Sequence, residues 1–123
     1  MVFPPPEVLP RLTTTQTIWL ATVRPDGRPH LAPLWFVWVS DAIHICVQPA
    51  SVKVRNIAAM PQVSIALIDS GPNTLCEGIA ATVPAPWPAT VREAFWQKYE
   101  WQIDTDQEYT LLLAITPTRW KEL

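Results

Sequence analysis

The residues best suited to chemistry lie in one short stretch, residues 50–61, which reads ASVKVRNIAAMP. Ser51 is typical of a helix N-cap, because its hydroxyl can accept a hydrogen bond from a first-turn N–H. Lys53, Arg55 and Asn56 follow within the next turn and a half. The free N–H groups and the positive dipole end of a helix N-terminus favour an anion such as phosphate. The stretch therefore predicts a phosphate site, and the alternative is a surface helix with solvated basic residues.

Within this stretch, helical geometry favours Lys53 and Asn56 as a pair. Residues three apart are neighbours on a helix surface, whereas Arg55 projects to nearly the opposite side from Lys53. An apolar face at helical spacing would pack the helix onto the rest of the protein: Val54, Ile57 and Ala58. The predicted phosphate ligands are therefore Ser51, Lys53 and Asn56, with Arg55 the least closely placed.

Other reactive side chains lack the partners that catalysis or metal binding requires. His44 has no nucleophile and carboxylate at a spacing typical of a triad, so we expect a structural or exposed role. Asp104 and Asp106 form a carboxylate pair, but without further ligands a solvated loop is favoured over a glycosidase or metal site. Cys46 and Cys76 have no C-x-x-C spacing, which favours two buried free thiols over a zinc site. The sequence identifies no catalytic side chain, and it predicts no metal site.

The elements that must position the phosphate site are mainly β-strands. Apolar or alternating runs predict about six strands, at residues 17–24, 30–39, 42–48, 63–68, 74–83 and 109–115. Residues 25–27, Pro-Asp-Gly, predict a hairpin turn between the first two strands. Pro33 predicts an edge or an opening in the second strand, because proline cannot donate to a ladder, and Gly78 predicts a bulge or a close approach. A further helix is predicted at residues 89–99.

The length and composition favour one small domain over residues 1–123. Prolines at positions 4–6 predict an extended arm over residues 1–12, in which residues 7–12 have the composition for a helical turn. The seven tryptophans are more than one small core needs, so most are expected in the core or at a subunit interface. A chain of this size would gain burial by forming a homodimer.

The charge pattern argues against two classes of partner. The net charge is −2 and no basic run stands out, which gives no electrostatic footprint for nucleic acid. No apolar run approaches the roughly 20 residues that a membrane-spanning helix needs, and the first residues lack the pattern of a signal peptide. The sequence therefore predicts a cytoplasmic protein that binds neither nucleic acid nor membranes.

Residues 20–67 resemble the pyridoxamine 5′-phosphate oxidase-like family of flavin-binding split β-barrels. The matching features, in the order of the family, are LATVRPDGRPHLAPLWF, SVKVRN, MPQVSI, EGIA at residues 77–80 and TPTRW at residues 116–120. The resemblance implies a split β-barrel of mostly antiparallel strands with two or three short helices. It also implies a homodimer with FMN in a groove between the subunits.

The resemblance assigns cofactor contacts beyond the phosphate end. Pro33, Leu34 and Trp35 correspond to the strand that lies along the flavin ring in the family. Asn73 lies near a family amide that contacts the ring, and the alternative is a turn asparagine. Trp120 lies in the closing motif and would reach the cofactor or the partner subunit, with barrel-closing packing as the alternative.

The resemblance implies an FMN-binding oxidoreductase that acts on a small-molecule substrate. Because the chain lacks the C-terminal extension of the vitamin B6 oxidases, the resemblance favours a small flavin- or deazaflavin-dependent reductase. No side chain needs to act as a nucleophile, since the flavin carries the chemistry. The alternative is a non-catalytic flavin- or haem-binding protein for storage, sensing or detoxification.

Overall fold

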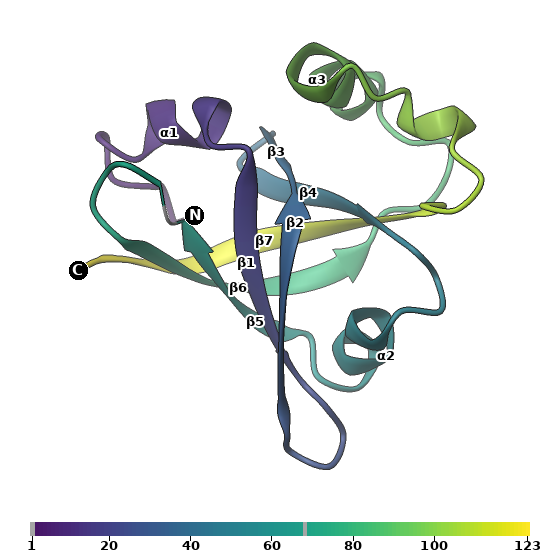
Figure 1. The fold of residues 1–123 in the computed structure, drawn as a ribbon, viewed down its shortest axis with the longest axis horizontal. Coiled ribbons are helices and arrows are strands. Elements are labelled where there is room, and N and C mark those ends of the chain that lie inside the picture. The colour runs from purple at the N-terminus through teal and green to yellow at the C-terminus, as the bar shows by residue number, and fades with distance from the viewer. Residues whose placement is uncertain (1, 68) are drawn as a thin grey trace.

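The computed structural model describes residues 2–67 and 69–123, which form a half-barrel of seven antiparallel strands with three α-helices (Figure 1). In chain order the elements are α1 (Leu9–Thr14), β1 (Thr17–Val23), β2 (Pro29–Trp35), β3 (Val37–Val39), β4 (Ala42–Val47), α2 (Val52–Ala59), β5 (Gln62–Leu67), β6 (Thr74–Thr82), α3 (Ala89–Tyr99), a 3-10 turn (Ile103–Thr105) and β7 (Leu111–Glu122). The predicted mainly β fold is confirmed. The sequence predicts that Met1 belongs to the arm and Ile68 to the fourth strand; both lie outside the described residues.

The seventh strand arises at Phe36, which divides the predicted strand at residues 30–39 into β2 and β3. Phe36 is completely buried, and α3 provides hydrogen-bond partners for its backbone. Its N–H donates to the Tyr99 hydroxyl at 3.0 Å, and its carbonyl oxygen accepts from Lys98 Nζ at 3.0 Å. Since β2 pairs with β1 and β3 pairs with β4, the chain crosses from one edge of the sheet to the other at this residue.

The sheet has the strand order β2-β1-β5-β6-β7-β4-β3, so β2 and β3 are its two edges. The edges are joined by the chain at Phe36, and no ladder connects them among the described residues. Strand β3 covers only the first half of β4, Ala42–His44, while β7 pairs with Ile43–Val47. The free edge of β2 and the second half of β4 therefore border an opening in the barrel. The predicted edge position of Pro33 is confirmed.

Two glycines confirm predicted backbone features. Gly27 adopts φ of 90° in the β1–β2 hairpin turn, where Arg24 N–H donates to the Arg28 carbonyl at 2.9 Å. Gly78 lies at a register shift between β6 and β7. A Cβ at Gly78 would meet Ile115 Cγ2 and the Thr116 carbonyl oxygen at 2.8 Å each, so only glycine allows these strands to approach as they do.

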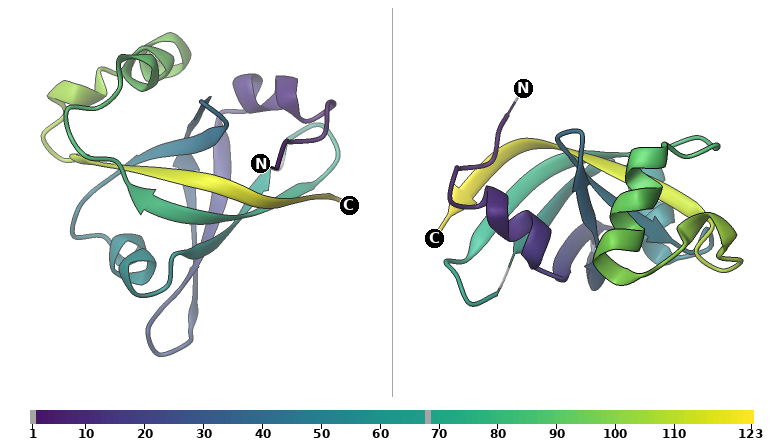
Figure 2. Two further views of the ribbon diagram at one scale, coloured as in Figure 1. Left: turned by 180° about the vertical axis from the view of Figure 1, so that it is seen from behind. Right: turned by 90° about the horizontal axis from the view of Figure 1, so that it is seen from above.

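The helices lie at opposite ends of the half-barrel. Helices α1 and α3 lie at one end, and α2 lies at the other beside the β1–β2 hairpin (Figures 1 and 2). Helix α1 begins at Leu9, so part of the predicted arm over residues 1–12 is helical, as the alternative for residues 7–12 allowed. Of the residues described, no helix is both long and apolar enough to cross a membrane.

Asp69 connects α1 to the loop between β5 and β6. Its carboxylate accepts hydrogen bonds from Arg11 Nη2 at 2.7 Å, Arg11 Nε at 3.1 Å and Gly71 N–H at 2.8 Å, and also from the Thr15 hydroxyl. These donors, with the Arg11 side chain the largest cause, lower the pKa of Asp69 well below its usual value. The ionised carboxylate is therefore part of what holds α1 in place.

We expect Asp69→Asn to destabilise the protein by about 1 to 3 kcal/mol at pH 7, because it removes a charge-assisted bidentate contact. A carboxylate with a lowered pKa in the folded state stabilises above its unfolded pKa, and this stabilisation is lost as the pH falls through the folded pKa. The difference between wild type and variant should therefore narrow from pH 7 to pH 3. Thermal unfolding at both pH values tests this. A difference that is equal at both would contradict it, and Asp104→Asn, in an exposed pair with Arg92, serves as control.

Candidate functional site

The N-terminus of α2 presents unpaired polar groups. Ser51 adopts the extended backbone of an N-cap, and its carbonyl oxygen accepts from Val54 N–H at 3.2 Å and from Arg55 N–H at 3.4 Å. Its hydroxyl makes no capping bond and is buried without a hydrogen-bond partner in the described part of the chain. A buried hydroxyl without a partner is costly, so this oxygen is available to bind a further group.

Nitrogen-bearing side chains gather around Lys53, two residues after Ser51. Lys53 is half-buried, and desolvation lowers its pKa. The pKa of His30 is lowered first by burial and then by the positive charges of Arg24 and Lys53, which therefore lie near it. His30 Nδ1 is also buried without a partner among the described residues. An anion here would relieve the repulsion between the cations and pair the orphaned polar atoms.

The other two predicted phosphate ligands, Asn56 and Arg55, have different surroundings. Asn56 is buried, and its Nδ2 donates to the Thr22 hydroxyl at 2.9 Å, which ties α2 to β1. The predicted surface pairing of Lys53 with Asn56 is therefore wrong, because Asn56 lies on the buried side of the helix. Arg55 is exposed and lines a hollow of about 360 Å³ together with Asn56 and Arg24. An Arg28–Asp26 ion pair also borders this hollow.

The predicted ring contacts lie at the opening between β2 and β4. Leu34 points toward the core, whereas Pro33 and Trp35 alternate to the outer face. All three line a cavity of about 510 Å³. The rest of its lining comes from β4, the end of α3 and the segment before β7: Cys46, Tyr99, Glu100, Trp101, Asp106 and Tyr109. The cavity thus lies at the opening, at the end of β2 away from His30.

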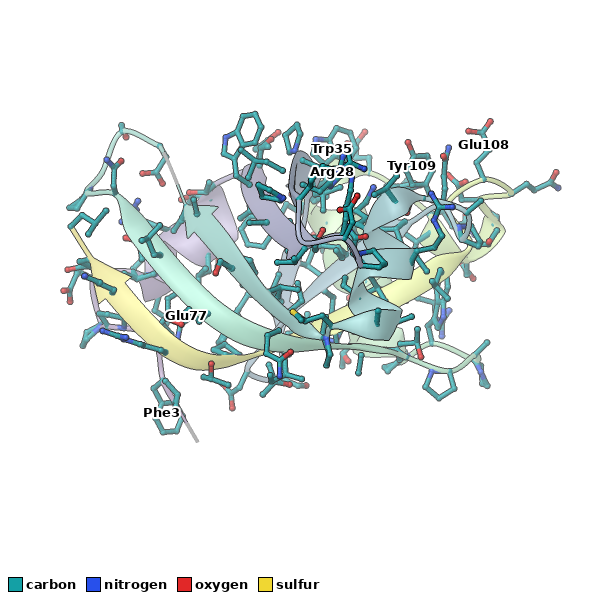
Figure 3. All side chains as sticks on the ribbon, turned by 90° about the horizontal axis from the view of Figure 1, so that it is seen from below. Phe3, Arg28, Trp35, Glu77, Glu108 and Tyr109 are labelled. Carbon is teal, nitrogen blue, oxygen red and sulfur yellow. The ribbon has the colours of Figure 1, made fainter. Side chains whose placement is uncertain are left out.

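Aromatic rings form much of this cavity. Trp35 stacks on Tyr99 with ring centroids 4.5 Å apart and planes 5° apart. Trp101 meets Trp35 edge-on at 6.0 Å and Tyr109 edge-on at 5.7 Å. Trp35 remains 49% exposed. Figure 3 shows Trp35 and Tyr109 among the side chains of the protein. The cavity therefore offers aromatic faces and edges to a planar ligand.

Cys46 contributes no thiolate to the cavity. Burial raises the pKa of its thiol to about 12, and Asp106 contributes to the same rise. Burial also raises the pKa of the Cys76 thiol to about 12. Both cysteines are free and buried, which confirms the predicted pair of buried thiols. His44 is buried in β4, and burial lowers its pKa, in agreement with a structural role. Groups of three or more potential metal ligands are absent from the residues described.

Two predicted cofactor contacts lie away from the site. Asn73 is exposed in the turn before β6, where its carbonyl oxygen accepts from Leu123 N–H at 2.9 Å. Trp120 lies on β7 and packs against the core, with its ring edge-on to Trp38 at 6.0 Å. Neither residue lines the cavity beside β2. Within this chain Trp120 packs on the core and Asn73 lies in a turn, and their contacts with a cofactor stay predictions.

The sequence did not single out Arg24 as a residue of the site, and it left the role of His30 open. Arg24 and His30 belong to the β1–β2 hairpin, which lies beside α2, and the Asn56–Thr22 hydrogen bond ties α2 to β1. The aromatic residues of the α3 end and the following segment were expected only as packing residues. Their density between residues 95 and 109 was the available signal.

Comparisons with known proteins agree with this architecture. A family model described as pyridoxamine 5′-phosphate oxidase matches residues 4–123. The haem storage protein HutZ from Vibrio cholerae has a TM-score of 0.82 at 20% identity, with 98% of this chain and 95% of that chain covered. The conserved hypothetical protein Rv2991 from Mycobacterium tuberculosis has a TM-score of 0.80 at 25% identity, with 99% and 85% covered. An F420 reductase has a TM-score of 0.71 at 25% identity, with 87% and 90% covered. No curated protein matches the sequence significantly.

Proposed function

Because this chain belongs to the pyridoxamine 5′-phosphate oxidase-like family of split barrels, we propose that it binds FMN at the opening between β2 and β4 and acts as a small flavin-dependent reductase. The observation that carries the proposal is the buried Ser51 hydroxyl without a hydrogen-bond partner in the described chain, at the N-terminus of α2 and close to Lys53. This arrangement fits a phosphate better than it fits a solvated surface helix.

The residues present fit both ends of the cofactor. Ser51, Lys53 and the first N–H groups of α2 would hold the phosphate, with His30 beside them. The free edge of β2 would lie along the ring, with Leu34 as part of its apolar wall. Asn56 would act indirectly, because its bond to β1 holds α2 in position.

When bound, the flavin would supply two-electron or hydride transfer. The protein would contribute orientation, a partly dry wall and control of access. The raised pKa of Cys46 keeps its thiol protonated at neutral pH, so it is not assigned as a nucleophile. We assign no catalytic side chain, and the small-molecule substrate is expected to reach the ring through the opening.

We also propose a homodimer with the cofactor between the subunits. The outer face of the sheet bears exposed apolar side chains from β1, β2 and β6: Trp19, Leu31, Leu75 and Ile79. Several of them surround a hollow of about 360 Å³ that Arg119 and Lys121 border. An exposed apolar face on a chain this small favours a second copy as its cover. A monomeric mass by light scattering at micromolar concentration would contradict the dimer.

Titration of the purified protein with FMN tests the proposed cofactor. We expect saturable binding in the micromolar range or tighter, with quenching of flavin fluorescence by the nearby tryptophans. The absorption spectrum of the protein as purified distinguishes flavin from the deazaflavin F420 and from haem. Absence of saturable binding at high micromolar FMN, together with binding of F420 or haem, would overturn the assignment.

The reductase assignment requires a separate measurement. Reduction of an acceptor by NADPH, NADH or reduced F420 should be faster with holoprotein than with free cofactor. Tight FMN binding without turnover across a broad acceptor panel would instead support storage or sensing.

A further inference from the structure

The aromatic cavity at the end of α3 has a charge pattern that the cofactor proposal does not use. Two acidic residues line it, Glu100 and Asp106, and no lysine or arginine does so among the described residues. Asp106 accepts from the N–H groups of Glu108 and Tyr109 at 2.8 Å each and from Trp101 Nε1 at 3.0 Å. These donors, with the backbone N–H of Tyr109 first, lower the pKa of Asp106 and keep it ionised at neutral pH.

The backbone at the end of α3 also makes the cavity favourable for a positive charge. Glu100 is the C-cap of α3, an 11-residue helix, and its left-handed backbone has φ of 54°. The C-terminal end of a helix carries the negative end of its dipole, which favours a cation. Tyr99 and Glu100 place this negative end at the cavity wall.

The aromatic residues are suited to the same kind of ligand. Trp35 uses one face to stack on Tyr99 and is still 49% exposed, while Tyr109 is 38% exposed. Aromatic faces attract cations through the ring quadrupole and stack well on planar rings. The other end of the opening, at Lys53 and Arg24, has the opposite charge. An anionic ligand is therefore favoured at α2 and disfavoured at α3.

We propose that the cavity lined by Trp35, Tyr99, Trp101 and Tyr109 binds a planar aromatic cation, of the class of N-alkylated pyridinium and quinolinium rings. The aromatic walls recognise the ring, and Glu100 and Asp106 recognise its positive charge. The ligand's role as a substrate rests on the proposed function, whereas its binding in the cavity does not require the cofactor.

A series of three probes of similar shape tests the inference: 1-methylquinolinium as the cation, quinoline as the neutral ring and quinoline-4-carboxylate as the anion. Isothermal titration of cofactor-free protein at pH 8 should rank their affinities in that order. We expect the cation to bind at least about threefold more tightly than quinoline, and more weakly as NaCl is raised. Equal or tighter binding of the carboxylate would overturn the inference.

Matched variants identify the cavity as the binding site. Trp35→Leu should weaken 1-methylquinolinium about 3- to 30-fold, whereas Trp96→Leu, at an exposed tryptophan of α3 outside the cavity, should change it less than twofold. Glu100→Gln should weaken it about 2- to 5-fold at low salt, and Glu93→Gln on the same helix should not. Unchanged binding in both Trp35→Leu and Glu100→Gln, with normal melting temperatures, would also overturn the inference.

The same samples separate this inference from the proposed cofactor. FMN binding without 1-methylquinolinium binding rejects the cation cavity and keeps the cofactor proposal. Binding of 1-methylquinolinium without FMN binding supports the cavity and rejects the cofactor proposal.

Discussion

Lys53→Met is expected to weaken FMN binding by about 10- to 150-fold. The variant keeps the aliphatic stem but removes a charge-assisted hydrogen bond to phosphate, which is worth roughly 1.5 to 3 kcal/mol, and each 1.4 kcal/mol is a tenfold change in affinity. Lys53 is half-buried, desolvation lowers its pKa, and it forms no ion pair within residues 2–67 and 69–123. The apoprotein should therefore be no less stable after the substitution. Fluorescence titration with FMN measures the affinity.

Riboflavin provides the matched ligand for this test, because it has the ring without the phosphate. Its affinity should change little in Lys53→Met, and a similar loss for both ligands would mean that the substitution distorted the pocket. Arg92→Leu removes one positive charge from α3, at the other end of the half-barrel, and should keep FMN affinity. Equal FMN affinity in Lys53→Met and wild type would show that Lys53 does not bind the phosphate.

Phe36→Ala is expected to cost about 3 to 5 kcal/mol of folding stability, the range for truncating a large buried aromatic residue. The ring is completely buried, and Lys98 Nζ lies 3.7 Å from its centroid. Truncation would leave a cavity beside the half-buried ammonium of Lys98, which would lose its contact with the ring. Burial already lowers the pKa of Lys98 to about 8. The melting temperature should fall by about 10 to 20 °C.

Phe36→Leu is the control for this prediction, because it preserves most of the apolar volume. Phe36→Leu should lose less folding free energy than Phe36→Ala. Because the stability of a dimer depends on protein concentration, both variants are compared at the same concentration. Tyr99 should keep its contacts to the backbone of residue 36 in both variants, since these use main-chain atoms. A loss below about 1 kcal/mol in Phe36→Ala would show that the crossing between the sheet edges does not depend on the ring.

The position of helix α2 was predicted more accurately than the surroundings of its polar side chains. The helix start at Ser51 follows from local chemistry, and the structure places α2 at Val52–Ala59. Periodicity could not decide which side of the helix Asn56 would occupy. The structure buries Asn56 against Thr22, a residue 34 positions earlier, so the amide belongs to packing. Arg24 and His30 lie near Lys53, because the charges of Arg24 and Lys53 both lower the pKa of His30, and no local pattern connects these hairpin residues to α2.

The sequence by itself determined the approximate places of most strands, the turn at Gly27, the bulge at Gly78 and the edge position of Pro33, because each follows from rules that act over a few residues. It did not determine that the last strand extends to Glu122, seven residues beyond the predicted end. It did not determine the split at Phe36. That residue lies in an apolar run typical of one continuous strand, and the break depends on hydrogen bonds to Lys98 and Tyr99 more than 60 positions away. The aromatic cavity depends on tertiary structure for the same reason, because β2 meets the end of α3 only where the barrel opens.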